Sequence, residues 1–201
     1  MIKKIIYLFL VLVNAFTLSG CNRKTSESDT IEMTGTFEFV TYDDKSYALK
    51  SYTGEDLYVV IPSEYNGYPV STILDNAFKE NSIVNTIIIP DSVTSIGSSA
   101  FYRCSKLTSI TIPNGVTILE SGLFQDCYNL LEIYLPITIQ KIENYVYFSY
   151  RTSTRETLLI YYAGSTNEWS YIQIDRNAFR EKSGDTFSEY KVIYNYQELN
   201  D

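Results

Sequence analysis

A 23-residue repeat in the middle of the chain constrains the fold more than any other feature of the sequence. The stretch AFYRCSKLTSITIP at 100–113 is followed 23 residues later by LFQDCYNLLEIYLP at 123–136. One unit of this length cannot bury its apolar face alone, so the units must stack and share a continuous core. The aligned columns are Ile73, Ile96, Leu119 and Ile142; Phe78, Phe101 and Phe124; Val84, Leu107 and Leu130; Ile87, Ile110 and Ile133; Val93, Val116 and Ile139; and Pro90, Pro113 and Pro136.

Each unit contains a six-residue apolar segment that predicts a short strand. The segments VNTIII, LTSITI and LLEIYL begin at Val84, Leu107 and Leu130, and their first, fourth and sixth residues are expected to point inward. Stacking places these strands in a parallel ladder with a spacing of about 4.8 Å. The Ala-Phe segment of each unit is expected to form one helical turn whose phenylalanine fills the core. A fourth unit begins at Ile137 and has Tyr147 in the phenylalanine position. The predicted fold class is a β-rich α/β solenoid.

The segments that flank the repeats predict irregular, β-rich caps. Residues 35–70 are the predicted N-terminal cap, in which 37–62 alternates like two or three strands and Asn66–Gly67 forms a turn. Residues 71–144 are the predicted repeats, and residues 145–201 are the predicted C-terminal cap or extension. The elements expected in the C-terminal cap are a strand over 158–164, a short helix over 166–172 with Thr166 or Asn167 as N-cap, a Trp169 that packs within the cap, and a final strand over 188–196.

The N-terminus has the pattern of a bacterial export signal. Two lysines precede the apolar stretch 5–18, which is too short for a good membrane-spanning helix, and LSGC follows, ending at Cys21. This ending resembles the lipobox of bacterial lipoproteins. The resemblance implies that residues 1–20 are a lipoprotein signal peptide, and that residues 21–34 are a lipidated Cys21 with a flexible tether. The alternative is a plain signal peptide with an unrelated cysteine nearby.

The charge balance and the absence of histidine exclude several kinds of site. The chain has 16 basic and 24 acidic residues, a net charge of −8, and no histidine. An acidic surface repels nucleic acid, so no nucleic-acid partner is expected. Without histidine neither a Ser-His-Asp nor a Cys-His catalytic pair exists. No phosphate-binding glycine motif or zinc-type cysteine spacing occurs, so neither a cofactor nor a metal is predicted.

Carboxylates leave one catalytic alternative open, because a glycosidase needs only two of them. Asp43–Asp44 and Glu55–Asp56 nevertheless have the pattern of turn residues. The stretch SGDTFSE at 183–189 contains only part of a calcium-binding loop and would bind calcium weakly.

Two cysteines, Cys104 and Cys127, remain after Cys21 and are separated by the repeat period. Stacked residues of a solenoid point the same way, whereas a disulfide needs two converging Cα–Cβ vectors. They are therefore predicted to be buried free thiols or small polar residues of the core, with a disulfide as the alternative.

The repeat resembles a known bacterial family. The stretch IPDSVTSIGSSAFYRCSKLTSITIP at 89–113 is similar to the unit of BspA-like leucine-rich repeat proteins, and 59–78 and 160–172 resemble segments that flank such arrays. The resemblance implies a short leucine-rich repeat array in a surface-exposed protein, and some members of the family are linked with adhesion, matrix binding or coaggregation. This chain has three clear repeats and lacks a cell-wall sorting motif, so the lipid on Cys21 would anchor it to the bacterial cell membrane, outside the cytoplasm.

With no catalytic motif, function is expected on the outward face of the strands. The favoured hypothesis is a non-enzymatic, adhesion-type protein that binds a host or bacterial protein. The alternatives are a carbohydrate-binding module that uses tyrosines as stacking platforms, and an extracellular carboxylate-based hydrolase. The residues predicted to form the binding face are Thr86, Ile88, Ser109, Thr111, Glu132 and Tyr134.

Overall fold

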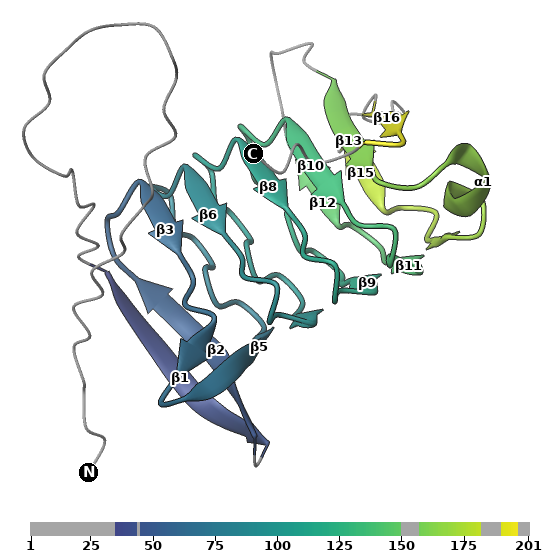
Figure 1. Ribbon diagram of the computed structural model, residues 1–201. Helices are drawn as coiled ribbons and strands as arrows, with labels where there is room; N and C mark the ends of the chain where they lie inside the picture. Colours follow the sequence, from purple (N-terminus) through teal and green to yellow (C-terminus); the bar gives the residue numbers. More distant parts are fainter. Residues whose placement is uncertain (1–34, 44, 150–156, 182–189, 197–201) are drawn as a thin grey trace, which may run out of the picture.

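The computed structural model describes residues 35–43, 45–149, 157–181 and 190–196 (Figure 1). The predicted signal peptide, the lipidation site Cys21 and the tether lie outside the described residues, as does the partial calcium-binding loop at 183–189. The described chain forms a β-rich solenoid of stacked coils with an antiparallel hairpin at its N-terminal end. This arrangement confirms the predicted fold class.

The N-terminal cap is built from strands that precede the repeats. Strands β1 and β2 form an antiparallel hairpin, β5 pairs in parallel with β2, and β4 pairs with β5 across a turn. Asn66 and Gly67 form that turn with φ angles of 52° and 77°, because a two-residue type I′ turn requires positive φ at both positions. The strands of this cap are β1 (Thr36–Asp43), β2 (Ser46–Thr53), β4 (Glu64–Tyr65) and β5 (Tyr68–Ile73).

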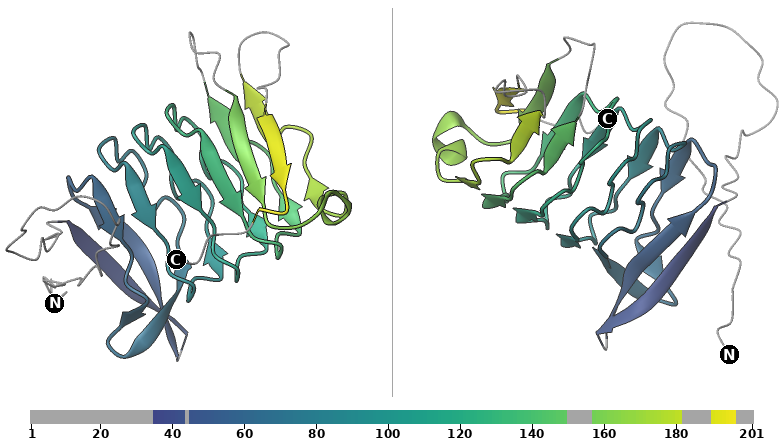
Figure 2. Two further views of the ribbon diagram at one scale, coloured as in Figure 1. Left: turned by 45° about the horizontal axis from the view of Figure 1, so that its top comes forward. Right: turned by 180° about the vertical axis from the view of Figure 1, so that it is seen from behind.

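The broad face of the solenoid consists of parallel strands, one from each coil (Figure 2). β3 pairs with β6, and β8, β10, β13 and β16 form one four-stranded sheet. The N–H of Thr108 donates to the carbonyl of Asn85 at 3.3 Å and joins the two sheets in series. These strands are β3 (Tyr58–Val60), β6 (Thr86–Ile88), β8 (Ser109–Thr111), β10 (Glu132–Leu135), β13 (Leu158–Tyr162) and β16 (Tyr190–Tyr194).

A second line of very short strands runs along another side of the coils. β9 pairs with β11 and β11 pairs with β14, all in parallel. β7 pairs in parallel with β5 of the N-terminal cap. Further along, β12 pairs with β15. The coils therefore continue beyond residue 144, where the repeat is no longer obvious in the sequence. The strands are β7 (Ser95–Ile96), β9 (Ile118–Leu119), β11 (Lys141–Ile142), β12 (Tyr147–Ser149), β14 (Gln173–Ile174) and β15 (Phe179–Glu181).

The Ala-Phe segments form hydrogen-bonded turns, so the prediction of a helical turn at these positions was wrong. The N–H of Phe101 donates to the carbonyl of Leu123 in the next coil at 3.1 Å, and the N–H of Arg103 donates to that of Gln125 at 2.8 Å. In a helix these N–H groups would donate to carbonyls of the same segment. Two columns of residues with positive φ bend the chain here: Asn76, Ser99, Gly122 and Tyr145; and Glu80, Arg103 and Asp126.

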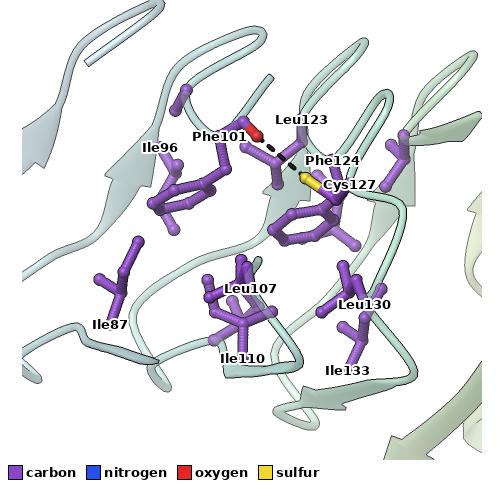
Figure 3. Close-up of a cluster of buried hydrophobic side chains, with 14 of the residues drawn as sticks. Ile87, Ile96, Phe101, Leu107, Ile110, Leu123, Phe124, Cys127, Leu130 and Ile133 are labelled. Atoms are coloured by element: carbon purple, nitrogen blue, oxygen red, sulfur yellow. Dashed lines mark hydrogen bonds between the residues drawn. The ribbon is translucent and has the colours of Figure 1, made fainter. Parts of the chain in front are cut away.

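Aromatic rings stack through the core from coil to coil. The ring of Phe101 lies 5.7 Å from that of Phe124 (Figure 3). On its other side it lies 5.5 Å from the ring of Phe78, and Tyr52 extends the stack into the N-terminal cap at 5.3 Å from Phe78. Tyr147 takes the next place in the column and is buried, with its hydroxyl donating to the carbonyl of Leu130 at 3.5 Å. This hydrogen bond explains how a tyrosine can replace a core phenylalanine.

The inward positions of the strands agree with the sequence pattern. The first, fourth and sixth residues of the three apolar segments are buried, except for Ile89, which is partly buried and packs against the core. Because side chains alternate across a strand, the residues between them face away from the core.

Cys104 and Cys127 are buried free thiols, as predicted. The Cys104 Sγ donates to the carbonyl of Phe78 at 3.2 Å. The Cys127 Sγ donates to the carbonyl of Phe101 at 3.0 Å, as Figure 3 shows. Each thiol thus bonds to the backbone of the preceding coil. Burial raises the pKa of Cys104 to about 12, so the thiol stays protonated and keeps its donor at neutral pH.

The C-terminal cap contains one short helix, α1 (Thr166–Trp169). Its N-cap is Ser165, so the prediction of Thr166 or Asn167 was wrong. Ser165 Oγ accepts from the Glu168 N–H at 3.3 Å, and the Glu168 carboxylate accepts from the Ser165 N–H at 2.7 Å, which completes a capping box. Trp169 packs edge-on against Tyr162 at 5.2 Å, as expected for a residue that holds the cap together.

The ring stack predicts a large loss of stability when its central member is removed. Replacing Phe101 with alanine leaves a cavity between two rings, and we expect the free energy of unfolding to fall by about 3–5 kcal/mol. Ile137→Ala, at a side chain that is 50% exposed, is the control and should change it by less than about 0.5 kcal/mol. Urea denaturation followed by circular dichroism measures both, and similar losses in the two variants would contradict the account.

Candidate interaction groove

Two rows of outward-facing residues cross the broad face of the solenoid, one residue from each strand. The register places Thr111 beside Tyr134 and Tyr134 beside Tyr161, and it places Ser109 beside Glu132. All six residues predicted for the binding face lie in these rows. The first row consists of Val60, Ile88, Thr111, Tyr134, Tyr161 and Ile193, and the second row of Tyr58, Thr86, Ser109, Glu132, Leu159 and Lys191.

A groove of about 940 Å³ runs over the central part of this face. Five of the six predicted residues line it, and Glu132 lies just behind Tyr134, to which it is hydrogen-bonded. One wall is formed by the segments that follow the strands, which include Pro90 and Asp91. Of the described residues that line the groove, Asp91 alone is charged. The groove is therefore almost uncharged on a protein whose net charge is −8.

Three tyrosines gather at one end of the groove. The rings of Tyr134 and Tyr161 are stacked, with their centroids 4.6 Å apart and their planes within 10° of parallel. Tyr196 follows β16 and lies across both, at 4.9 Å from Tyr134 and 5.4 Å from Tyr161. Such packing gives a rigid apolar surface with polar hydroxyls at its edge, a combination that is common in binding sites.

Glu132 holds the hydroxyl ends of two of these tyrosines. Tyr134 donates to one carboxylate oxygen at 2.9 Å, and Tyr161 donates to the other at 3.5 Å. Burial and the hydrogen bond to Glu132 raise the pKa of Tyr134, and burial together with the Glu132 charge raises the pKa of Tyr161. Both phenols therefore remain neutral donors at physiological pH. Within the described part of the chain, no lysine or arginine forms an ion pair with Glu132.

Sequence reasoning missed Tyr161 and Tyr196, which complete the aromatic cluster. Tyr161 lies 27 residues after Tyr134 instead of 23, so counting by the repeat period does not reach it. The alternating pattern LLIYY at 158–162 carried the missing signal, because its outward positions continue both rows. Tyr196 follows a strand and has no repeat position, so nothing in the sequence pattern pointed to it.

Two of the four acidic residues that were considered for catalysis, Asp43 and Asp56, have structural partners, and Asp44 lies outside the described residues. Asp43 accepts the N–H of Lys45 in a turn at 2.8 Å. Asp56 accepts the hydroxyl of Tyr52 and the N–H of Gly35, and it thereby closes the N-terminal end of the core. Over the described residues, no group of three or more Cys, Asp or Glu side chains is arranged to hold a metal ion. No helix in the same residues is long and apolar enough to cross a membrane.

The same substitution should affect the melting temperature very differently at two neighbouring residues of β6. Ile87 is 3% exposed and Ile88 is 42% exposed, because their side chains lie on opposite faces of the strand. Ile87→Glu buries an unpaired charge and should lower the melting temperature by more than about 10 °C or prevent folding. Ile88→Glu should shift it by less than about 2 °C. Thermal denaturation of the two variants checks this orientation, and a fold that tolerates Ile87→Glu would contradict it.

Structures of other leucine-rich repeat proteins have a related fold. The chain is 31% identical to a leucine-rich repeat protein from Bacteroides ovatus with a TM-score of 0.48, over 57% of this chain and 31% of that one. A leucine-rich repeat protein from Bacteroides capillosus is 23% identical with a TM-score of 0.51, over 79% and 93%. A leucine-rich cell surface protein from Faecalibacterium prausnitzii is 22% identical with a TM-score of 0.49, over 87% and 55%. The chain thus spans less than a third of the Bacteroides ovatus protein.

A family comparison agrees with the stacked coils. Residues 71–181 match the family described as BspA type leucine-rich repeat region, in six copies. No curated protein matches the sequence. The six copies extend beyond the three clear repeats of the sequence. They reach β15, which pairs with β12. Because this match covers more than half of the chain, the protein belongs to the BspA-type leucine-rich repeat family.

Proposed function

We propose that this protein is a lipid-anchored bacterial surface protein that binds another protein in the groove that runs over its two outward rows. The observation that carries the proposal is the composition of the groove. Its lining is apolar, aromatic or small and polar, with the single charge of Asp91, on a chain with 24 acidic residues. Interfaces have this character at their centre, where charged residues are depleted and tyrosine is enriched.

The rigidity of the groove also favours binding. Its floor is a parallel sheet and one end is fixed by the tyrosine cluster, so little side-chain freedom remains to be lost when a partner binds. The same tyrosines favour a second candidate function, which is glycan binding, because sugar rings stack on exposed aromatic faces. The protein interpretation fits the whole length of the groove, whereas a sugar would use only the aromatic end.

Binding in the groove is tested by capture with immobilised residues 22–201. The test variant carries Ile88→Glu, Thr111→Glu and Tyr134→Glu. The control carries Ile118→Glu, Ile137→Glu and Tyr171→Glu, which add the same charge at exposed positions outside the groove. Bacterial envelope and extracellular-matrix extracts are the sources of partner, and a retained protein is then purified and titrated against all three forms.

We expect one protein to bind the unmodified chain and the control with equal affinity, and to bind the groove variant at least about tenfold more weakly. Circular dichroism must show that all three forms are folded. Equal binding to the groove variant would overturn the proposal. Retention on a glycan array that the groove variant loses, with no protein bound, would favour the carbohydrate interpretation.

Anchoring is tested separately, on the full-length chain expressed in a bacterium. A lipidated Cys21 carries at least two acyl chains, and two chains hold a protein stably on a membrane. We expect the protein to partition into the detergent phase of a Triton X-114 extract, and its N-terminal peptide to begin at Cys21 with the mass of a diacylglyceryl group. Cys21→Ser should remain in the aqueous phase. An unmodified Cys21 in the mature chain would contradict lipidation.

A further inference from the structure

The first row contains a gap at Thr111. Its neighbours on either side are Ile88 on β6 and Tyr134 on β10, both much larger side chains. Adjacent strands of a sheet lie about 4.8 Å apart, so the two flanking positions are separated by roughly 9–10 Å. Threonine fills only the base of this space. The result is a slot across the groove, with an aliphatic wall, an aromatic wall and a small polar floor.

The aromatic wall presents the flat face of its ring to the slot. The ring centroids of Tyr134 and Tyr161 are 4.6 Å apart, close to the strand spacing, and the ring planes lie within 10° of parallel, so the two rings stack in the direction that joins the strands. Tyr161 stacks on one face of Tyr134, and the register puts Thr111 on the other side of Tyr134, next to the ring face that Tyr161 leaves uncovered. Tyr196 is nearly equidistant from both rings, which places it beside the stacked pair rather than over that face.

Negative charge lies at the edge of the slot. Glu132 is hydrogen-bonded to the hydroxyl of Tyr134, and its described partners are two neutral phenols. Asp91 adds a second negative charge to the groove, and the described residues that line it include no lysine or arginine. Lys191 is in the same row as Glu132, two strands away and on the side opposite to the slot. A partner group that enters the slot therefore meets a carboxylate that no lysine or arginine of the described residues pairs with.

A flat cation matches these three features. A guanidinium group is planar, stacks on aromatic faces and donates several hydrogen bonds in one plane, and it is more weakly hydrated than an ammonium group. Glu132 uses one acceptor site on each oxygen for a tyrosine, and a carboxylate has about four such sites. A guanidinium stacked on Tyr134 can therefore also donate to Glu132.

The same chain contains this geometry elsewhere. On another side of the solenoid, the guanidinium carbon of Arg103 lies 5.0 Å from the centroid of the Tyr102 ring. Its nitrogens form ion pairs with Glu80 and Asp126 at 3.4 Å. There the chain supplies both the cation and the carboxylates. In the groove it supplies the ring and the carboxylate, and the cation is missing from the described residues.

We propose that the slot between Ile88 and Tyr134 binds an arginine side chain of the partner protein, stacked on Tyr134 and paired with Glu132. The inference rests on the proposed function, because it names the group by which the groove recognises a polypeptide. It makes the partner a protein that displays an exposed arginine, and it makes the affinity dependent on salt.

The experiment is a two-dimensional NMR titration of residues 22–201 with three amides: N-acetyl-arginine amide, its neutral isostere N-acetyl-citrulline amide, and N-acetyl-lysine amide. We expect saturable shifts centred on Thr111, Glu132 and Tyr134, with a dissociation constant of about millimolar, since one side chain supplies only part of an interface. Citrulline should bind at least about fivefold more weakly and lysine about threefold, because the first lacks the charge and the second the flat shape.

Three variants locate the site, and one serves as a charge control. Thr111→Trp fills the slot and should abolish the shifts, while Thr111 is exposed and its replacement should leave the fold intact. Glu132→Gln keeps the acceptor for tyrosine and should weaken arginine binding about fivefold or more. Tyr134→Leu keeps the bulk, lacks the aromatic face, and should weaken it similarly. Glu64→Gln removes one exposed charge in the N-terminal cap and should change nothing.

The outcomes separate this inference from the proposed function. Equal binding of arginine and citrulline, or arginine shifts that persist in Thr111→Trp, would overturn the arginine slot. The proposed function would then still hold if a partner were captured through the groove, because capture is tested with the variant that carries Ile88→Glu, Thr111→Glu and Tyr134→Glu. Conversely, arginine binding in the slot with no partner lost on the groove variant would overturn the proposed function and leave the slot as a site for another cation. Uniform shifts over the acidic surface would overturn the slot.

Discussion

The stacking of each coil on the next holds the whole fold together. A single coil has a few apolar side chains on a closed path of about 23 residues, and it cannot exclude water from them on its own. The phenylalanine stack fills the centre, and backbone hydrogen bonds from each turn to the next satisfy donors that a helix would satisfy internally. Both interactions require neighbours on two sides, which is why the ends need caps of different sequence.

That contact also determines where a binding site can form. Residues that point inward are fixed by packing, and residues in the tight turns are fixed by positive φ and by hydrogen bonds between coils. The outward positions of the strands carry neither constraint, so their side chains can vary without loss of the fold. Parallel register then places one such residue from every coil in a straight row, and a few substitutions are enough to create a slot, an aromatic wall and a charge.

Much of the fold was predictable because residues that are one repeat period apart contact each other in neighbouring coils. The columns that contain Phe101 and Cys104 revealed which residues stack, and alternation along each strand revealed which residues face outward. The predictions were wrong where a backbone N–H group or a capping position has two possible hydrogen-bond partners. The turn at 100–101 has helix-like spacing, yet its donors bond to the next coil, and Ser165 takes the capping position from its neighbours because Glu168 completes the box. At the site, Tyr161 was hidden by a change in spacing and Tyr196 by the absence of any pattern.

Hydrogen–deuterium exchange of residues 22–201, with and without a purified partner, tests whether function lies in the two outward rows. Added protection is expected in peptides covering 86–91, 109–114 and 132–136, which form the groove, while 118–119, 141–142 and the N-terminal hairpin exchange as before. Protection confined to the second line of strands, to the hairpin or to the C-terminal cap would contradict it, and would show that the rows are only the solvent-exposed face of the sheet.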